Sequence, residues 1–357
     1  MQALVKNLVR PELRAMQAYA VADPTGAVKL DAMENPYTWP ADLKAQWLGE
    51  LQDEELNRYP DPQANVVRDL LKANMQIPAE FDLLLGNGSD EIIQMLIMAL
   101  AGNQRGVLAP APGFVMYEMI CAYTGLPYLS VDLEQDFDLD TDAMLRTIEE
   151  QQPVLIFLAR PNNPTGNVFS EQKVRAIIEA STGLVVIDEA YIPFTETHAL
   201  GLLRDYENLL VMRTLSKLGL AGVRLGMLIG RPEWIREVDK LRLPYNINVL
   251  TQNAVQFALR HQTVLDDQAL HIKQDRAALY AQLQALPQLE VWASEANFFL
   301  FRILQGGAEA VQQQLLQQGV LIKNLHGKHR LLDNCLRVTV GTEAENALFL
   351  AALKASI

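Results

Sequence analysis

Cysteine is scarce in this 357-residue chain, which contains only Cys121 and Cys335. Two cysteines cannot build a disulfide framework or a cysteine metal site, and this usage is typical of proteins in a reducing cytosol. Long apolar runs are also missing. The longest strongly apolar stretch, residues 92–101, contains Gln94 and is too short to span a bilayer, so it predicts a buried helix.

Basic residues are in the minority, since 30 lysines and arginines stand against 43 aspartates and glutamates and leave a formal net charge of −13. Such a balance would repel the phosphates of a nucleic acid, so no nucleic-acid partner is expected. The first sixteen residues lack an uninterrupted apolar stretch and a cleavage site, so no signal peptide is expected. These features predict a cytoplasmic protein without a membrane partner.

The chain does contain an alternation of short apolar runs and helical patterns between residues 83 and 230. The apolar runs are nearly continuous, as in strands buried on both faces of a sheet. This alternation indicates an α/β domain with a mostly parallel seven-stranded sheet, whose sites lie beyond the carboxyl ends of the strands. The expected strands are 83–85, 107–109, 128–131, 154–158, 184–187, 209–212 and 225–229, and expected helices include 90–100, 115–123 and 171–180.

The pattern changes after Pro244. Helical periodicity fills roughly 249–286, and strand candidates at 298–302 and 336–340 flank a helix at 308–318 that Gly319 closes. Chains longer than about 250–300 residues usually divide into domains. We predict a large domain over 36–245 and a smaller α+β domain that combines 246–357 with an N-terminal arm over 1–35.

Lys217 is the first candidate for chemistry. A strand candidate leads into hydroxyl side chains at 214 and 216, the lysine follows, and a glycine-rich stretch and Arg224 come after it. Such a lysine can form a Schiff base with an aldehyde cofactor while hydroxyls and an arginine hold a phosphate, which is the chemistry of pyridoxal 5′-phosphate. An isolated lysine would instead be a solvated loop residue, so the interpretation depends on two segments upstream.

Asp188 follows the strand candidate at 184–187 and precedes Glu189. A carboxylate at a strand end can pair with a protonated pyridine nitrogen and raise the pKa of that nitrogen, because an opposite charge favours the protonated form. The ring then accepts electrons. A magnesium carboxylate of a P-loop ATPase also follows four apolar residues, but it requires G-x-x-x-x-G-K-[ST], which the chain lacks.

Asn163 lies in the turn at 160–166, directly after another strand candidate. Its amide is placed to donate to a cofactor ring oxygen, although the same residues would make an ordinary tight turn. Upstream, the backbone N–H groups of Gly88, Ser89 and Asp90 open a helix and form a cradle for a phosphate. An ordinary helix cap would use the same residues.

No metal site is predicted. His326 and His329 lie three residues apart without a third ligand nearby, which favours a surface loop. The segment at 86–91 fails the dinucleotide pattern G-x-G-x-x-G, because Glu91 takes the place of the third glycine. The nucleophile elbow G-x-S-x-G and the zinc motif H-E-x-x-H are also absent.

Together these segments resemble the motifs of the fold type I aminotransferases that use pyridoxal 5′-phosphate. The letters N-P-T-G at 163–166, D-E-A-Y at 188–191 and T-L-S-K at 214–217 occur in the family's order, with steps of 25 and 29 residues from Asn163 to Asp188 to Lys217. The resemblance covers essentially the whole chain. It is greatest to the histidinol-phosphate branch, also through segments 30–36, 56–60, 88–91 and 336–342.

The resemblance implies roles for individual residues. Lys217 would form the Schiff base and carry protons, Asp188 would pair with the ring nitrogen, and Tyr191 would be the third catalytic residue. The implied cofactor-binding set is Tyr59, Ser89, Asp90, Phe114, Asn163, Asp188, Tyr191, Thr214, Ser216, Lys217 and Arg224. The implied substrate-binding set is Tyr19, Asn163, Lys323 and Arg337.

Three of these assignments carry further expectations. Phe114 would stack on the ring face, and Arg337 would bind the anionic end of the substrate. Tyr59 would reach the cofactor phosphate of a neighbouring subunit, which implies a homodimer. Two positions depart from the family: Arg224 follows Lys217 by seven residues where many relatives have eight, and Lys323 replaces a second substrate arginine. A lysine is a point charge rather than a planar fork, so it would bind phosphate in a different geometry.

The implied reaction transfers an amino group between glutamate and imidazole-acetol phosphate, giving histidinol phosphate and 2-oxoglutarate in histidine biosynthesis. Three alternatives remain open at this point. An aromatic amino-acid aminotransferase would share every cofactor motif, and a threonine-phosphate decarboxylase would share the fold. A regulator that senses the cofactor would need a DNA-binding module, for which the short N-terminal segment offers no room.

Overall fold

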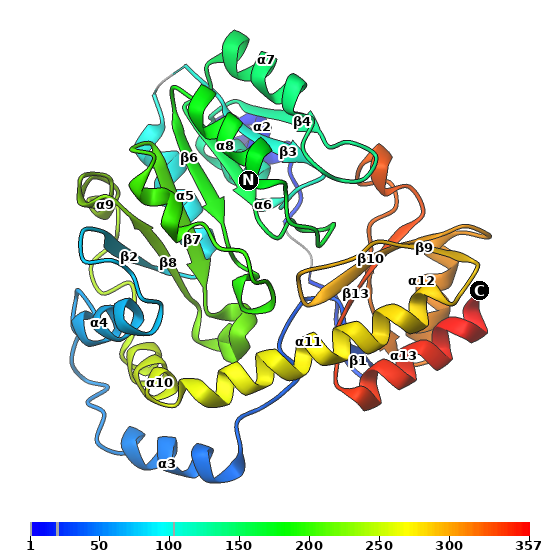
Figure 1. The fold of residues 1–357 in the computed structure, drawn as a ribbon. Helices are drawn as coiled ribbons and strands as arrows, with labels where there is room; N and C mark the ends of the chain where they lie inside the picture. The colour runs from blue at the N-terminus through cyan, green and yellow to red at the C-terminus, as the bar shows by residue number, and fades with distance from the viewer. Residues whose placement is uncertain (1, 19–20, 103) are drawn as a thin grey trace.

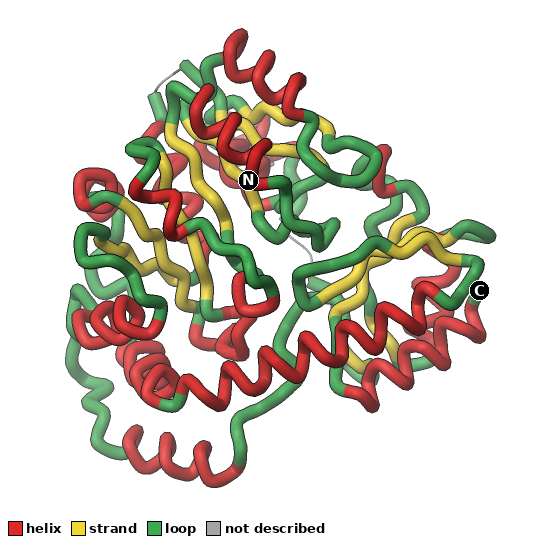
Figure 2. The backbone as a smooth tube through the Cα atoms, viewed as in Figure 1, coloured by secondary structure: helices red, strands yellow, loops and turns green. Residues whose placement is uncertain are grey.

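The computed structural model describes residues 2–18, 21–102 and 104–357 of the chain. A seven-stranded sheet and a four-stranded sheet form the centres of two parts of the molecule (Figures 1 and 2). The long helix α11 (Gln262–Gln284) leads from the first part to the second along one side of the molecule (Figure 1).

The seven-stranded sheet confirms the predicted α/β architecture. Its spatial order is β2-β8-β7-β6-β5-β3-β4. The pairs of β8 with β2 and with β7 are antiparallel, and the other pairs are parallel. The strands are β2 (Asp82–Asn87), β3 (Val107–Ala111), β4 (Tyr128–Asp132), β5 (Leu155–Ala159), β6 (Leu184–Asp188), β7 (Leu209–Thr214) and β8 (Leu225–Gly230). Each of the seven predicted apolar runs therefore forms a strand of this sheet.

Helices cover both faces of the sheet, which explains why its strands are apolar at nearly every position. In β7, Leu210 and Met212 pack with helices α5 (Ser89–Leu100), α6 (Met116–Thr124) and α9 (Pro232–Asp239). Leu209 and Val211 point to the opposite face, which α4 (Asn65–Asn74), α7 (Thr141–Gln151) and α8 (Glu171–Ala180) cover. Each fully buried aliphatic side chain contributes roughly 1.5–3 kcal/mol by leaving water.

The second part is built on the antiparallel sheet β12-β13-β10-β9. Its strands are β9 (Leu289–Val291), β10 (Phe298–Ile303), β12 (Lys323–Asn324) and β13 (Cys335–Thr339), with helices α12 (Ala308–Gln317) and α13 (Glu343–Ser356). Gly319 follows α12 with a φ of 80°, as expected of a residue that closes a helix. The N-terminal segment joins this part, because β1 (Val28–Lys29) pairs with β11 (Val320–Leu321).

The predicted domain limits at 36, 245 and 246 remain a proposal. The pairing of β1 with β11 supports the grouping of the N-terminal arm with the smaller part. However, α10 (Val249–Arg260) packs against α3 (Ala41–Leu51) and α4 of the larger part. The helical pattern predicted over 249–286 also divides into α10 and α11, because the backbone of His261 leaves the helical region at φ −113° and ψ 32°.

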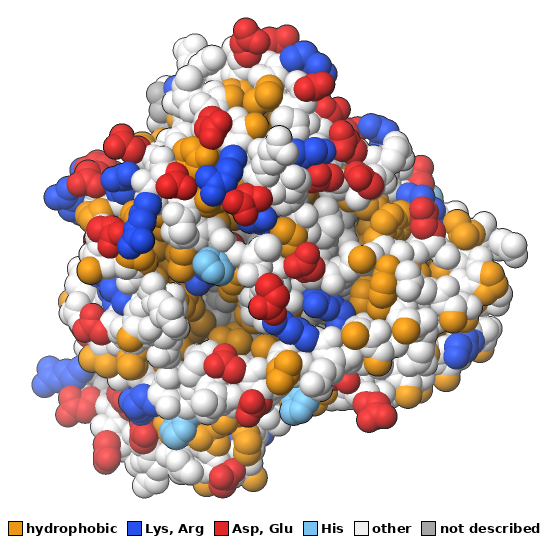
Figure 3. Space-filling view, in the orientation of Figure 1, with side chains coloured by type: hydrophobic (Ala, Val, Ile, Leu, Met, Phe, Trp, Pro, Cys, Tyr) orange, Lys and Arg blue, Asp and Glu red, His pale blue; other side chains and the backbone are white. Residues whose placement is uncertain are grey.

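The remaining elements are short. They are α1 (Gln2–Leu8), α2 (Pro11–Ala15), η1 (Ile192–Phe194), η2 (Leu200–Arg204), η3 (Ser216–Leu220), η4 (Ala221–Val223) and η5 (Arg330–Leu332). Across residues 2–18, 21–102 and 104–357, no helix combines the length and the apolar character that crossing a membrane requires. Acidic and basic side chains are interspersed over the face that Figure 3 presents.

Candidate active site

A pocket with about 580 Å³ of empty space opens where β5, β6 and β7 end. The predicted cofactor residues come together here with the exception of Tyr59. The lining consists of Met33, Ser89, Asp90, Phe114, Ala159, Pro161, Asn163, Asp188, Ala190, Tyr191, Thr214, Ser216, Lys217 and Arg224. The position at the carboxyl ends of parallel strands is the one that the sequence pattern predicts.

Asp188 is the last residue of β6 and is 4% exposed. One of its oxygens, Oδ1, accepts a hydrogen bond from the backbone N–H of Ala190 at 3.0 Å, and Oδ2 accepts one from the Tyr117 hydroxyl at 2.7 Å. Burial raises the pKa of Asp188 to about 6, although these hydrogen bonds act in the opposite direction. A cation bound beside this carboxylate would relieve the cost of burying its charge.

Lys217 projects into the same pocket from η3, the turn that follows β7. Its Nζ donates to the carbonyl oxygen of Ala32 at 3.1 Å and lies 5.7 Å from the centre of the Tyr191 ring. Burial lowers the pKa of Lys217 to about 8, and the positive charge of Arg337 acts in the same direction. The neutral amine that a nucleophile or a base requires is therefore more abundant near neutral pH than for an ordinary lysine.

Hydroxyl, amide and guanidinium groups gather at one side of the pocket. The hydroxyls of Thr214 and Ser216 lie 2.9 Å apart, and the N-terminus of α5 begins at Ser89. Arg224 adopts a left-handed φ of 53°, and its Nη2 lies 3.4 Å from Oδ2 of Asp90. Gly88 has a φ of 82°, which favours glycine, and a Cβ there would lie 2.5 Å from the same Nη2. Helix N-termini and guanidinium groups of this kind bind phosphate.

The spacing of seven residues between Lys217 and Arg224 has a local structural counterpart. The turn η3 is a single π-helical turn in which Gly219 adopts a φ of 120°, and η4 follows it directly. Asn35 Nδ2 would lie 2.9 Å from a Cβ at position 219. The glycine therefore permits both the backbone conformation and the close packing that bring Arg224 to the pocket.

Arg337, on β13 of the smaller part, does not line the pocket but contacts Asn163, which does. Its Nη1 donates to Oδ1 of Asn163 at 2.5 Å, and its Nη2 donates to the backbone carbonyl of Asp31 at 2.9 Å. Lys323 lies opposite Arg337 in the register of β12 and β13. Burial lowers the pKa of Lys323, and the Arg337 charge lowers it further. Two neighbouring cationic side chains thus stand beside the pocket, suited to an anionic group.

Tyr59, the remaining predicted cofactor residue, lies outside the pocket. Tyr59 is 79% exposed and stacks on Tyr245, with ring centres 4.3 Å apart and planes inclined by 14°. It is not among the side chains that line the pocket. Tyr19 lies outside the described residues, so its place in the site remains a prediction.

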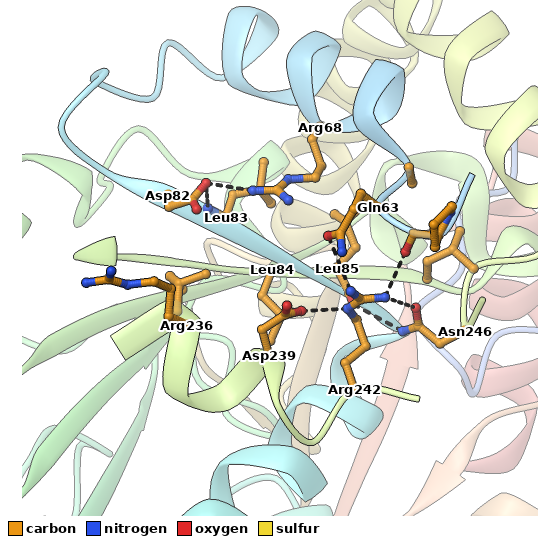
Figure 4. A pocket seen from close by; sticks show the side chains of 14 residues that line it. Gln63, Arg68, Asp82, Leu83, Leu84, Leu85, Arg236, Asp239, Arg242 and Asn246 are labelled. Carbon is orange, nitrogen blue, oxygen red and sulfur yellow. Dashed lines mark hydrogen bonds and ion pairs between the residues drawn. The ribbon is translucent and has the colours of Figure 1, made fainter. Parts of the chain in front are cut away.

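A second pocket is enclosed by α4, β2, α9 and the segment after α9, and polar side chains bond to one another across it (Figure 4). We call the bonds of Arg242 in this pocket the Arg242 clamp. At its centre, the Arg242 guanidinium bonds Oδ1 of Asp239 at 2.6 Å and the carbonyl of Pro62 at 2.8 Å. A second ion pair joins Arg68 and Asp82 at 2.7 Å. Arg242 thereby ties the chain near Pro62 to the chain after α9, which are the two segments that carry the exposed aromatic pair.

Sequence reasoning missed Tyr117, which contacts Asp188 directly. The only signal available was a tyrosine on the inward face of the helix that follows the β3 end, three residues after Phe114. It also missed the contributions of Met33 to the lining and of the Ala32 and Asp31 carbonyl groups to binding Lys217 and Arg337. Backbone acceptors leave no trace in residue type, so these contacts required the structure.

The donor set fits pyridoxal 5′-phosphate. A buried carboxylate suits a protonated ring nitrogen, an amine with a lowered pKa suits an aldehyde, and the cluster around Thr214, Ser216 and Arg224 suits a phosphate. Within the described ranges, no group of three or more His, Cys, Asp or Glu side chains is arranged to hold a metal ion.

Comparison with known proteins agrees with this chemistry. A family model for aminotransferases of class I and II matches residues 25–353. A histidinol-phosphate aminotransferase 2 of Nitrosococcus oceani is 53% identical over 98% of this chain and 98% of its own length. A histidinol-phosphate aminotransferase of Chromobacterium violaceum is 49% identical, with 99% of each chain covered. In fold, the chain is similar to histidinol-phosphate aminotransferase from Sinorhizobium meliloti in complex with pyridoxal 5′-phosphate, with a TM-score of 0.85, 23% identity, and coverage of 98% of this chain and 97% of that one.

Proposed function

The chain belongs to the class I and II aminotransferase family, and we propose that it transfers an amino group between glutamate and imidazole-acetol phosphate. It is a transaminase that uses pyridoxal 5′-phosphate. The proposed products are histidinol phosphate and 2-oxoglutarate. Support for this substrate pair comes from the near-full-length identity to the histidinol-phosphate aminotransferases of Nitrosococcus oceani and Chromobacterium violaceum.

The single structural observation that carries the proposal is the convergence of Lys217 and Asp188 on one pocket with opposite pKa shifts. Burial lowers the pKa of Lys217 to about 8 and raises the pKa of Asp188 to about 6. Because the pocket disfavours the charged form of the lysine, Lys217 is suited to react as a neutral amine. Because it also disfavours an unpaired carboxylate, Asp188 is suited to pair with a bound cation.

Bound pyridoxal 5′-phosphate supplies an aldehyde and a ring that accepts electrons. The chain's own groups then have distinct tasks. Lys217 Nζ holds the cofactor and moves the proton at the substrate Cα, acting as a general base with a suitable pKa. Asp188 keeps a positive charge on the ring nitrogen. Asn163 and Tyr191 hold the ring oxygen, and Phe114 covers the ring face.

Substrate binding is assigned to the cations of the smaller part. Arg337 is the proposed receptor for the phosphate of one substrate and the carboxylate of the other, because a planar guanidinium matches either anion in a bidentate manner. Its existing bonds to Asn163 and the Asp31 carbonyl hold the guanidinium at the pocket. Lys323, on the neighbouring strand, supplies a second positive charge.

The proposed assembly is a homodimer in which Tyr59 acts on the cofactor phosphate of the partner. The exposed stacked pair of Tyr59 and Tyr245 supports this assignment, since both rings retain area that a second copy would cover. A cytoplasmic location is proposed because Cys121 and Cys335 are both buried free thiols.

A substrate panel tests the function. The purified holoenzyme is incubated with 2-oxoglutarate and one amino donor at a time, and glutamate formation is measured. Histidinol phosphate should exceed phenylalanine and tyrosine in kcat/KM. Comparable values for the aromatic amino acids would favour an aromatic aminotransferase, and carbon dioxide release from threonine phosphate would favour a decarboxylase.

A further inference from the structure

Tyr117 has no role in the scheme above, although it contacts the carboxylate that the scheme depends on. Its side chain projects from α6 and is 1% exposed. The ring stacks on Phe157 of β5 with centres 4.4 Å apart and planes inclined by 3°. The edge of the same ring system meets Phe114, with centres 5.5 Å apart at 85°. Packing on two aromatic side chains leaves the Tyr117 ring one orientation.

In that orientation the hydroxyl is aimed at Asp188. The Tyr117 oxygen lies 2.7 Å from Oδ2 of Asp188, in the range of a charge-assisted hydrogen bond. Burial raises the pKa of Tyr117 well above its usual range, so the phenol stays protonated and remains a donor. The second oxygen of Asp188 is held by the Ala190 N–H. Both carboxylate oxygens thus accept hydrogen bonds from donors whose heavy atoms are held in place, one by aromatic packing and the other by the backbone.

The other ionisable groups around Asp188 do not replace this donor. Asp90 at the start of α5 and Glu189, the next residue, both raise the pKa of Asp188 by their negative charge. The Arg213 guanidinium on β7 forms an ion pair with Glu189 at 2.7 Å. Lys217 and Tyr191 line the pocket, with the lysine bonded to the Ala32 carbonyl. The Tyr117 hydroxyl therefore supplies a side-chain hydrogen bond to Asp188, and the Ala190 backbone supplies a second bond to the other oxygen.

We propose that Tyr117 is a positioning residue that orients Asp188 and keeps it ionised, and that its contact with Phe114 couples the ring-nitrogen partner to the side chain over the ring face. This inference deepens the proposed function, since it relies on Asp188 as the partner of the cofactor ring. The Tyr117 hydrogen bond favours the ionised form of Asp188, and an ionised Asp188 stabilises a proton on the ring nitrogen. A protonated, neutral Asp188 would not stabilise that proton.

The direct test is made on the cofactor-free protein. Infrared spectroscopy follows the carbonyl stretch of a protonated carboxyl group against pH, and its loss in Asp188→Asn assigns the band. In Tyr117→Phe, the midpoint of the Asp188 titration should move upward by about one to two pH units. This is the size expected for the loss of a hydrogen bond to a charged group. The matched control is Tyr128→Phe, which changes a partly buried tyrosine that packs against the same apolar cluster.

A second variant covers the case in which Tyr117→Phe folds poorly. Site-specific 3-fluorotyrosine at position 117 keeps the ring and strengthens the phenol as a donor, so the Asp188 midpoint should move downward. In the loaded enzyme, Tyr117→Phe should shift the pH at which the cofactor absorbance changes and should lower kcat more than it raises KM. Tyr128→Phe should leave both readouts unchanged.

Two results would overturn the inference. One is an Asp188 midpoint in Tyr117→Phe that equals that of the parent protein, and the other is a fluorotyrosine variant whose midpoint moves upward. The infrared measurement requires neither cofactor nor substrate. A failure of the proposed function would appear instead as absence of cofactor bound through Lys217, so the two failures are distinguishable.

Discussion

The floor of the active-site pocket, formed by Asp188 and Lys217, differs from the exposed pair of Tyr59 and Tyr245 in how far its side chains are buried and bonded within one chain. Asp188 is 4% exposed, and both of its oxygens accept hydrogen bonds from this chain. Tyr59 is 79% exposed and stacks on Tyr245, which is itself 40% exposed. Asp188 and Tyr59 both belong to the predicted cofactor-binding set, yet only Asp188 is buried in the core.

The difference indicates which parts of the site are complete in a single subunit. The floor lies at the ends of buried strands, where burial itself shifts the pKa of Lys217 and Asp188. Arg242 bonds Asp239 (Figure 4) and the carbonyl of Pro62, and this Arg242 clamp thereby joins the two segments that carry the tyrosine pair. Neither tyrosine lines the active-site pocket. Changes in the floor should therefore abolish chemistry, whereas changes in the tyrosine pair should weaken binding and depend on a partner.

The largest effect is expected for Lys217→Ala. It removes the amine that holds the cofactor and moves the proton, so turnover should fall by about 10⁴-fold or more. Borohydride reduction of the parent holoenzyme followed by peptide mapping should place the label on Lys217. The matched control, Lys240→Ala, removes a surface lysine paired with Glu237 and should retain full activity. Label on another lysine would contradict the assignment.

A pH profile sharpens the same prediction. The rate at which apoenzyme recombines with pyridoxal 5′-phosphate should rise with pH, because the neutral amine is the nucleophile. With the pKa of Lys217 lowered to about 8, the rate should level off above that pH rather than near the usual lysine value. Continued increase to pH 10 would show that burial does not activate this amine.

Asp188→Asn should come next in size. A neutral amide cannot hold a proton on the ring nitrogen, so turnover should fall by about 10²–10³-fold, as for other losses of electrostatic stabilisation. Cofactor should still bind through the cluster at Thr214, Ser216 and Arg224, which absorbance and equilibrium dialysis can verify. Near-normal turnover at full occupancy would remove Asp188 from the mechanism.

The comparison also explains what the sequence could predict. All seven strands of the large sheet and the convergence at 163, 188 and 217 follow from apolar runs and from residues placed at strand ends. Tyr117 could not be predicted, because a tyrosine on a buried helical face resembles any other core aromatic until its hydroxyl is seen 2.7 Å from Asp188. The break at His261 was missed because the apolar pattern continues across it.

Arg337→Ala should have an intermediate effect on both half-reactions. Losing a charge-assisted contact of about 1.5–3 kcal/mol should lower kcat/KM for histidinol phosphate and for glutamate by roughly 10–100-fold. Removing the guanidinium charge should also raise the pKa of Lys217 and move the recombination profile to higher pH. Arg302→Ala, which removes an arginine paired with Glu290, is the control. An effect on only one substrate would refute a shared receptor.

The smallest effect is expected for Tyr59→Ala, and it tests the comparison most directly. A hydroxyl bonded to a phosphate contributes about 1.5–3 kcal/mol, so cofactor dissociation should become at least about tenfold easier while Lys217 remains able to bind it. If Tyr59 acts within its own subunit, an exposed side chain would have to reach the pocket from outside its lining. Action across a subunit interface requires no such movement.

Mixed dimers of Tyr59→Ala and Lys217→Ala, isolated by two different tags after co-expression, distinguish these arrangements. Under limiting cofactor, Tyr59→Ala alone should be clearly impaired. In the mixed dimer, action across the interface places both defects in one site and leaves the other site intact, so about half of the parent activity per dimer should return. Action within a subunit leaves one defect in each site, and the mixed dimer should then be no more active per subunit than the mean of its parents. The second outcome would show that Tyr59 acts on the cofactor of its own subunit, as Asp188 and Lys217 do. The pocket floor and the tyrosine pair would then no longer differ in their need for a partner.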